Sequence, residues 1–247
     1  MDIFILALAI LPVIVLLIYI YKQDKYEKEP VRMLALAFLL GILSIPLTLF
    51  LDGVIDVMIG GTSVFYVAFF QAGIPEEFAK WVLFMLVIWR NKNFDEFFDG
   101  IVYMSFIGLG FACVENIMYV FGEQELLSSL RVGVMRAVLS VPAHFLFAVI
   151  MGYFLAMAKF VRANRTKYLC FSLLFPILAH GLFDYLLMLS SFVSEIGFDF
   201  VGFILLVGFV LLDIKMWKVC LKNIKRMQEN TRVERNNKIF WNIFKSK

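Results

Sequence analysis

Apolar residues form long, nearly continuous runs along the chain, separated by short polar segments. The runs cover about 3–21, 33–51, 64–89, 100–121, 134–158, 168–190 and 201–217. An α-helix needs about 20 apolar residues to cross the hydrocarbon core of a bilayer. None of the runs alternates with the two-residue period of a barrel strand, and only helices and closed barrels can span a membrane. The pattern therefore predicts an all-α integral membrane protein with about seven transmembrane helices.

Composition supports this interpretation. The 247 residues are 62% hydrophobic with a mean hydropathy of +0.86, more apolar surface than a soluble domain of this length can cover. The third and fifth runs exceed the length needed, so we expect them to tilt or protrude. No soluble domain or internal repeat stands out, and we expect one polytopic membrane domain over residues 1–247. The first run lacks a basic leader and a cleavage motif, which favours a retained helix over a signal peptide.

Lysine and arginine positions predict the orientation. All but three of the 23 basic residues fall in the first, third and fifth loops or in the segment from Lys215 onward. The exceptions are Lys80, Arg131 and Arg136. The positive-inside rule then places the N-terminus outside the cell and the C-terminus in the cytoplasm. Residues 222–247 are expected to form a basic cytoplasmic tail, either solvated or lying on the anionic inner leaflet.

The most unusual stretch lies in the middle of the third apolar run. It reads Gly-Ile-Pro-Glu-Glu-Phe-Ala-Lys over residues 73–80, so Glu76, Glu77 and Lys80 fall near the centre of a bilayer. A charge there costs at least about 2.5 kcal/mol and usually serves a function. Pairing of Glu76 with Lys80, one turn away, would neutralise two of the charges. Glu77 remains unexplained by pairing, which favours a functional site over a packing pair.

Further polar residues lie in the next three runs. Glu115 lies in the fourth run, on the same helix face as Phe111 one turn earlier. Both histidines of the protein fall in predicted spans, His144 in the fifth and His180 in the sixth. Asp184 follows His180 by one turn, so the carboxylate and the imidazole can meet. Both histidines lie in predicted membrane spans beside buried acids. This placement indicates a functional site and not two ordinary core residues.

The depth of these polar residues in the bilayer gives an independent check that they can form one site. With a helical rise of about 1.5 Å per residue, these acids and histidines lie roughly 9 to 18 Å below the outer ends of their spans. They therefore share the middle-to-outer part of the bilayer although their helices run in opposite directions. Pro75, Pro142 and Pro176 precede three of them, where helices can bend and open a cavity. We predict one polar site enclosed by the third to sixth spans.

Two hydrolytic mechanisms fit these residues. In the first, Glu76 or Glu77 activates a water molecule, Lys80 holds the other carboxylate ionised, and the histidines stabilise the oxyanion or protonate the leaving amine. In the second, Glu115, His144 and His180 bind zinc and Glu77 is the base, as in two-histidine, one-carboxylate proteases. The sequence lacks H-E-x-x-H, and ligand spacing across separate helices does not distinguish the two mechanisms.

The ordered motifs resemble the PrsW family of bacterial intramembrane proteases over about residues 70–185. They are Glu76-Glu77-x-x-Lys80, Phe111-x-x-x-Glu115, His144 after Pro142, and His180-x-x-x-Asp184. The resemblance implies a multi-pass protein of the bacterial inner membrane. It also implies site-1 cleavage of a single-span anti-sigma factor, which starts the release of a sigma factor in a stress response.

The family is in turn distantly similar to the CAAX-processing and bacteriocin-immunity proteases. Glu115 stands where that superfamily has a histidine, and Asp184 stands where some members have an asparagine. An anionic aspartate cannot donate a hydrogen bond to an oxyanion, so Asp184 is expected to orient His180 instead. The missing imidazole can come from His144 on another helix.

We also consider two other classes of function. A proton-coupled transporter can employ buried acids and histidines as a relay, although paired halves with interrupted helices are not evident. A non-catalytic scaffold can bind partner helices through the small residues Gly108, Gly110 and Ala112 of the fourth run. Nothing in the sequence indicates nucleic-acid binding, and the three cysteines are too scattered for disulfides or a zinc knuckle.

Overall fold

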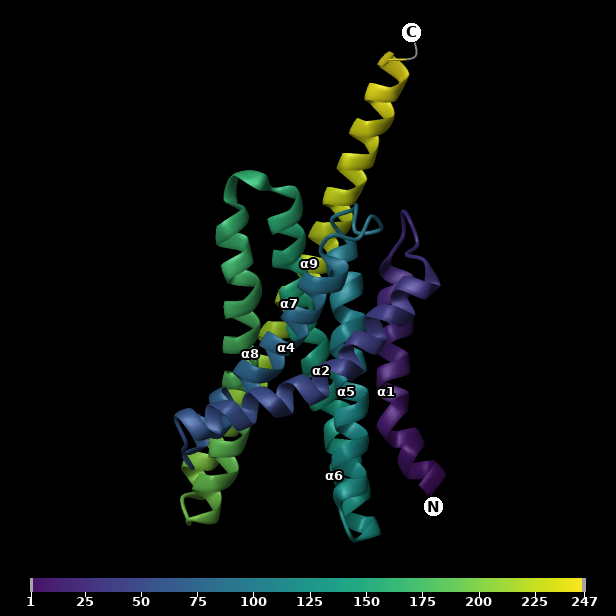
Figure 1. The fold of residues 1–247 in the computed structure, drawn as a ribbon. Helices are drawn as coiled ribbons and strands as arrows, with labels where there is room; N and C mark the ends of the chain where they lie inside the picture. Colours follow the sequence, from purple (N-terminus) through teal and green to yellow (C-terminus); the bar gives the residue numbers. More distant parts are fainter. Residues whose placement is uncertain (1, 246–247) are drawn as a thin grey trace.

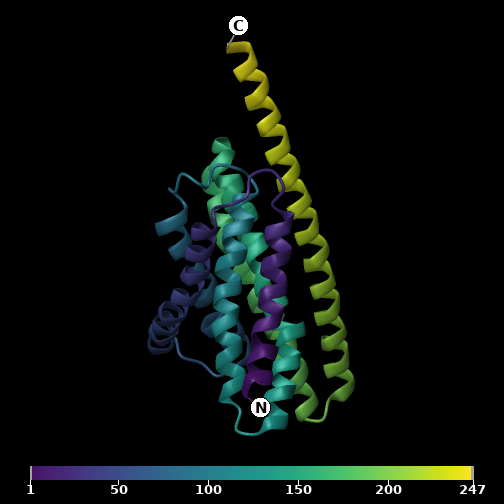
Figure 2. The same cartoon turned by 90° about the vertical axis from the view of Figure 1, so that its right-hand side faces the viewer.

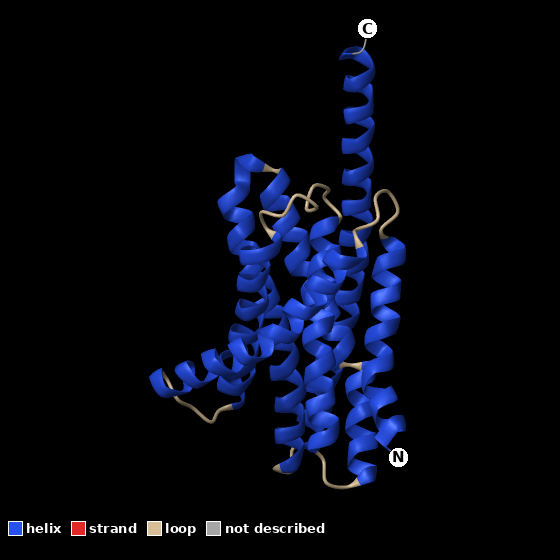
Figure 3. Cartoon of the chain, turned by 45° about the vertical axis from the view of Figure 1, so that its right-hand side comes forward, coloured by secondary structure: helices blue, strands red, loops and turns tan. Residues whose placement is uncertain are grey.

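The computed structural model describes residues 2–245, with side chains from residue 3 to residue 237. The described residues are helical with short loops and contain no strand (Figure 3). In chain order the elements are α1 (Asp2–Gln23), α2 (Val31–Met58), α3 (Val64–Tyr66), η1 (Val67–Gly73), α4 (Ile74–Leu83), η2 (Phe84–Ile88), α5 (Asp99–Gly122), α6 (Leu126–Val138), α7 (Ser140–Phe160), η3 (Arg162–Asn164), α8 (Arg165–Glu195) and α9 (Asp199–Lys245). The predicted all-α membrane fold is confirmed.

Six helical segments in the described part of the chain are long and apolar enough to cross a membrane. They are Ile3–Gln23, Val31–Met58, Asp99–Gly122, Leu126–Phe160, Arg162–Glu195 and Asp199–Asn237. The expected third span is a helical segment that is continuous from Val64 to Ile88 but built from α3, η1, α4 and η2. The protein is therefore a multi-pass membrane protein. The expected fifth span differs in its first part. The helix is interrupted at Leu139, and the residues before it form the separate helix α6.

The two ends of the bundle carry different loops. The N-terminus and the loops at residues 59–63, 123–125 and 196–198 lie at one end, and the C-terminus lies at the other (Figures 1 and 2). The opposite end holds residues 24–30, 89–98 and 161–164, and we call it the basic end. These are the loops that the sequence groups on one side by their lysine and arginine content. Their shared position agrees with an alternating path of seven crossings.

Helices α5 and α7 occupy the middle of the bundle, and nearly every residue of α7 from Ala143 to Ala158 is buried. Glycines allow their close approach, because a Cβ added at Gly152 would lie 2.3 Å from the carbonyl oxygen of Gly100. Helices α2 and α5 meet in the same way at Gly41 and Gly110. Contacts between glycines are how membrane helices gain dispersion energy without a hydrophobic driving force.

Helix α2 leaves the bundle in its later part. It packs on α5 near Gly41 and then runs outward toward the loop at residues 59–63 (Figures 1 and 3). Pro46 lies inside the helix, and a proline at such a position removes a hydrogen bond and permits a bend. A cavity lies between α2, η1 and α5 on this side of the site.

The expected tail at residues 222–247 is the continuation of α9 as far as Lys245, and residues 246–247 lie outside the described residues. This part of α9 packs on the basic end, where Met227 and Thr231 are buried and the Thr231 hydroxyl accepts from the Phe98 N–H. Arg235 Nη1 lies 3.1 Å from Glu96 Oε1. Burial raises the pKa of Glu96 to about 7, against the opposing effect of the Arg235 charge.

Candidate active site

The acidic segment of the third crossing forms the short helix α4. Pro75 lies in its first turn, and because α4 continues directly from η1, the missing proline N–H removes one hydrogen bond to the preceding turn. Glu76 and Glu77 follow in the same turn and Lys80 lies one turn later, and all three side chains are buried. The neighbouring segments η1 and η2 are π-helical. Such wide turns are rare and frequently occur at functional sites.

The Lys80 ammonium lies at the centre of the charged groups. It donates to Glu77 Oε1 at 2.8 Å and to Glu76 Oε2 at 3.3 Å, and it lies 3.4 Å from His144 Nδ1. Its fourth neighbour is the Phe111 ring, whose centroid is 3.9 Å from the nitrogen. Two carboxylates therefore face one ammonium, so the segment keeps an excess negative charge inside the bundle.

Both imidazoles are held on two sides by charged side chains. On α7, His144 Nε2 lies 2.7 Å from Glu115 Oε2 of α5, which leaves Nδ1 facing α4. On α8, His180 Nε2 lies 3.2 Å from Asp184 Oδ2, and Nδ1 lies 3.0 Å from Glu77 Oε1. In each case a carboxylate behind the ring fixes its orientation and the opposite nitrogen points toward α4, where His144 meets the Lys80 ammonium and His180 meets Glu77. This is the arrangement that orients metal-binding histidines in many proteins.

Aromatic rings keep these imidazoles in place. Phe147 stacks on His180 with ring centroids 4.6 Å apart and planes inclined by 19°. Phe111 contacts His144 at a centroid distance of 5.3 Å. Close contact between Gly73 of η1 and Gly181 of α8 brings the two helices together beside His180. The imidazole positions are therefore set by packing as well as by charge.

Arg136 is a site residue that sequence reasoning missed. Its Nη2 lies 2.7 Å from Glu115 Oε2, and its Nε donates to Asn116 Oδ1. The Asn116 amide in turn donates to the carbonyl of Ala9 on α1, so it supports the helices and does not face a substrate. The available signal was spacing, since Arg136 precedes His144 by about two helical turns. The helix break at Leu139 obscured that relation.

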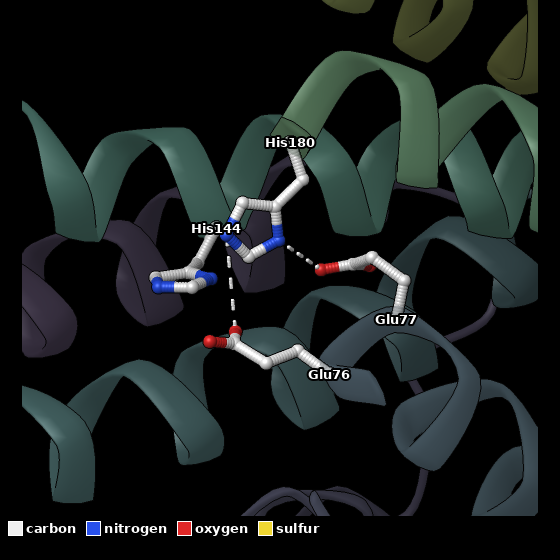
Figure 4. Close-up of side chains that lie close together, drawn as sticks. All are labelled: Glu76, Glu77, His144 and His180. Carbon is white, nitrogen blue, oxygen red and sulfur yellow. Dashed lines mark hydrogen bonds and ion pairs between the residues drawn. The ribbon is translucent and has the colours of Figure 1, made fainter. Parts of the chain in front are cut away.

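Glu76, Glu77, His144 and His180 bring their ligand atoms within 4.8 Å of one another, and all four residues are buried (Figure 4). Glu115 and Asp184 lie outside this group, each behind one of the imidazoles. Glu77 Oε2 is buried and has no hydrogen-bond partner among the described residues. Imidazole nitrogens and carboxylate oxygens are ligands that a divalent transition metal takes. The residues present thus form a possible metal-binding cluster.

Two cavities reach the cluster from different sides. The first, of about 630 Å³, lies between α2, η1 and α5, and the second, of about 350 Å³, lies between α5, α7 and α8. Glu76 lines both cavities, whereas Glu77 and Lys80 are not among the lining residues of either. His144 and His180 line the second cavity. Glu76 is therefore the α4 carboxylate that a bound molecule would meet.

Comparison with known proteins identifies the family. Residues 29–212 match the model of the PrsW family, described as intramembrane metalloproteases. The chain is 34% identical to Protease PrsW of Clostridioides difficile over 94% of each chain. It is 38% identical to Protease PrsW of Oceanobacillus iheyensis, over 92% of this chain and 97% of that one.

This chain belongs to the PrsW family. A third relative, Protease PrsW of Bacillus subtilis, is 38% identical over 76% of this chain and 84% of its own. No solved structure matches the chain significantly. The resemblance stated from the sequence motifs is confirmed, and the chain is an intramembrane peptidase.

The clustered residues all lie within the stretch that matches the PrsW family. The structure brings together all the site residues that the sequence predicted, namely Glu76, Glu77, Lys80, Glu115, His144, His180 and Asp184. They come from α4, α5, α7 and α8, which correspond to the third to sixth predicted spans. The family description as a metalloprotease directs attention to the cluster of two histidines and two glutamates.

Proposed function

We propose that the chain is an endopeptidase that cleaves a single-span membrane protein in the outer part of the bilayer of the bacterial inner membrane. The observation that carries the proposal is Glu76, a buried α4 carboxylate that lines both cavities and belongs to the cluster of two histidines and two glutamates. The substrate implied by the PrsW resemblance is an anti-sigma factor. The basic end would face the cytoplasm by the positive-inside rule, with the N-terminus outside.

We further propose that His144, His180 and Glu77 hold a zinc ion and that Glu76 is the general base. Zinc supplies a polarised carbonyl and an activated water in such a site. Two observations support this ligand set: the ligand atoms of the three residues lie within 4.8 Å of one another, and Glu77 Oε2 has no hydrogen-bond partner among the described residues. Glu115 then orients His144 instead of binding the metal, and Asp184 orients His180.

The sequence left either Glu76 or Glu77 as the base in the metal-free mechanism and gave Glu77 in the zinc mechanism; the exposure of the two acids favours Glu76. Glu77 is held by Lys80 and His180 and is only 1% exposed. Glu76 lines both cavities, so it can reach a water molecule placed against a bound peptide. A general base must lie within hydrogen-bond reach of the proton that it removes.

The test combines bound metal with cleavage. We expect the full chain, purified in detergent, to contain zinc near one per chain and to cleave a single-span test protein. His144→Ala, His180→Ala and Glu77→Gln should lose zinc and activity together, whereas Glu76→Gln should keep zinc and lose activity. Glu125→Gln, at an exposed residue outside both cavity linings, is the matched control and should change neither.

Alternative outcomes separate the two mechanisms. Cleavage that resists a chelator in protein without metal, but is abolished in Glu76→Gln, would replace the zinc mechanism by a glutamate-dependent one. Cleavage restricted to the cytoplasmic half of the test substrate would contradict the proposed depth of the site. A protein that binds zinc but cleaves no single-span substrate would contradict the proposed substrate class.

A further inference from the structure

The larger cavity is a cleft that leads from the outer part of α2 to Glu76. Its walls are α2 from Ile45 to Asp52, η1 and the later part of α5. Apolar side chains such as Ile45, Leu49 and Met118 line much of it. The outward course of α2 separates these walls (Figure 3). Any peptide that approaches Glu76 from this side must pass the face of α2 that lines the cleft.

The charged residues that line the cleft are all acidic. They are Asp52, Glu76, Glu115 and Glu123, and no lysine, arginine or histidine is among the described residues lining it. The two catalytic-site acids are paired, Glu76 with Lys80 and Glu115 with His144 and Arg136. The remaining negative charge lies toward the outer end of the cleft.

Two polar side chains of α2 face this space without partners. Thr48 is 7% exposed and its Oγ1 has no hydrogen-bond partner among the described residues. Asp52 Oδ1, also buried, has none either. The residues are one helical turn apart, so they share a face of α2. Buried polar atoms are normally satisfied, and each exception needs an explanation.

We propose that Asp52 and Thr48 form a specificity subsite for a lysine or arginine side chain of the substrate. The proposal rests on the proposed peptidase function, since it assigns the ligand to a peptide segment just outside the substrate's membrane span. A long basic side chain can place its methylene stem along the apolar walls of the cleft and its charged head against the Asp52 carboxylate. Thr48 Oγ1 accepts a second hydrogen bond from the same head.

The subsite also excludes unsuitable substrates. An acidic residue at the same position would place like charges together in a cleft whose apolar walls reduce screening. Such repulsion discriminates between partners as effectively as new attraction does. The predicted specificity is therefore for a basic over an acidic residue at one position outside the substrate's span.

The first arm of the test measures binding without cleavage. Glu76→Gln protein in nanodiscs is titrated with fluorescent single-span peptides that carry lysine, glutamine or glutamate at successive positions of the outer flank. We expect one position at which lysine binds roughly tenfold more tightly than glutamate. Asp52→Asn should remove this preference and Asp52→Lys should reverse it, while Thr48→Val, of similar shape, should reduce it in part.

Controls identify the source of the preference. Glu125→Gln, at the same end of the bundle but outside the cleft, should leave the preference unchanged. Nanodiscs with and without phosphatidylethanolamine should give the same result. A preference that disappears when this lipid is present would show that its amine occupies the site and would overturn the peptide assignment.

The second arm uses protein with Glu76 intact and the same peptides as cleavage substrates. Selective binding without cleavage would contradict the proposed peptidase function on such substrates and leave the subsite standing. Cleavage of lysine and glutamate peptides with equal kcat/KM, together with equal binding, would overturn the subsite and leave the peptidase function standing. Loss of folding in Asp52→Asn is checked by thermal unfolding of the same preparation.

Discussion

The strongest prediction concerns the buried Lys80 ammonium. At an effective dielectric of about 20, its attractions to Glu77 at 2.8 Å and Glu76 at 3.3 Å are worth about 6 and about 5 kcal/mol. Desolvation of three buried charges offsets most of this energy, so the pairs contribute little net stability. Removing only the lysine is different, because both carboxylates then stay buried with only the His180 imidazole beside them. Lys80→Met should therefore lower the free energy of unfolding by about 3–5 kcal/mol.

Reversible unfolding in mixed micelles measures this loss. Lys159→Met is the matched control, because the Lys159 ammonium donates to a single backbone carbonyl, that of Trp89, and should cost about 1–2 kcal/mol. Adding Glu76→Gln to Lys80→Met should recover part of the loss but not activity. Zinc should stabilise Lys80→Met by mass action if the cluster binds it. A Lys80→Met protein no less stable than the Lys159→Met control would refute the reasoning.

Three further predictions concern other parts of the molecule. The folded protein holds the Glu96 proton more tightly than the unfolded chain, so the stability from this group is present below pH 4.5 and lost as pH rises through about 7. Glu96→Gln should flatten the pH dependence of Tm across that range; an unchanged profile would contradict it. Gly110→Val should destabilise by about 3 kcal/mol or more, because a Cβ at Gly110 would lie 2.2 Å from the Phe38 carbonyl oxygen, and chemical unfolding tests this. Glu115→Gln should weaken zinc binding about 10- to 100-fold by freeing His144, as measured by competition with a chelator; unchanged affinity would argue against an orienting role.

The fold was predictable because a bilayer imposes simple rules on a sequence. Apolar runs of sufficient length must be helices, so the crossings followed from hydropathy alone. The family resemblance also followed from four spaced motifs. The break at Leu139 was not predictable, because α6 and α7 are both apolar enough to continue one span.

The composition of the candidate site could be predicted better than its internal geometry. Buried acids and histidines stand out in apolar segments because their cost requires a reason. Which carboxylate faces a cavity depends on the rotation of α4 about its axis. The π-helical turns beside α4 alter that rotation, and the amino-acid sequence gives no clear signal for them. The pairing of Arg136 with Glu115 was not predicted, because the break at Leu139 sets how α6 packs beside α5 and so where the Arg136 side chain lies.

The π-helical segments have a consequence for how the chain tolerates changes of length. A wide turn holds an extra residue relative to an α-helical turn, and one residue corresponds to about 100° of rotation at 3.6 residues per turn. Deleting a single residue from η1 would let it close into an α-helical turn, and the elements before it would rotate relative to α4. Either the packing of η1 on α8 or the direction of Glu76 would then be lost. The segment around α4 should therefore tolerate insertions and deletions less well than substitutions.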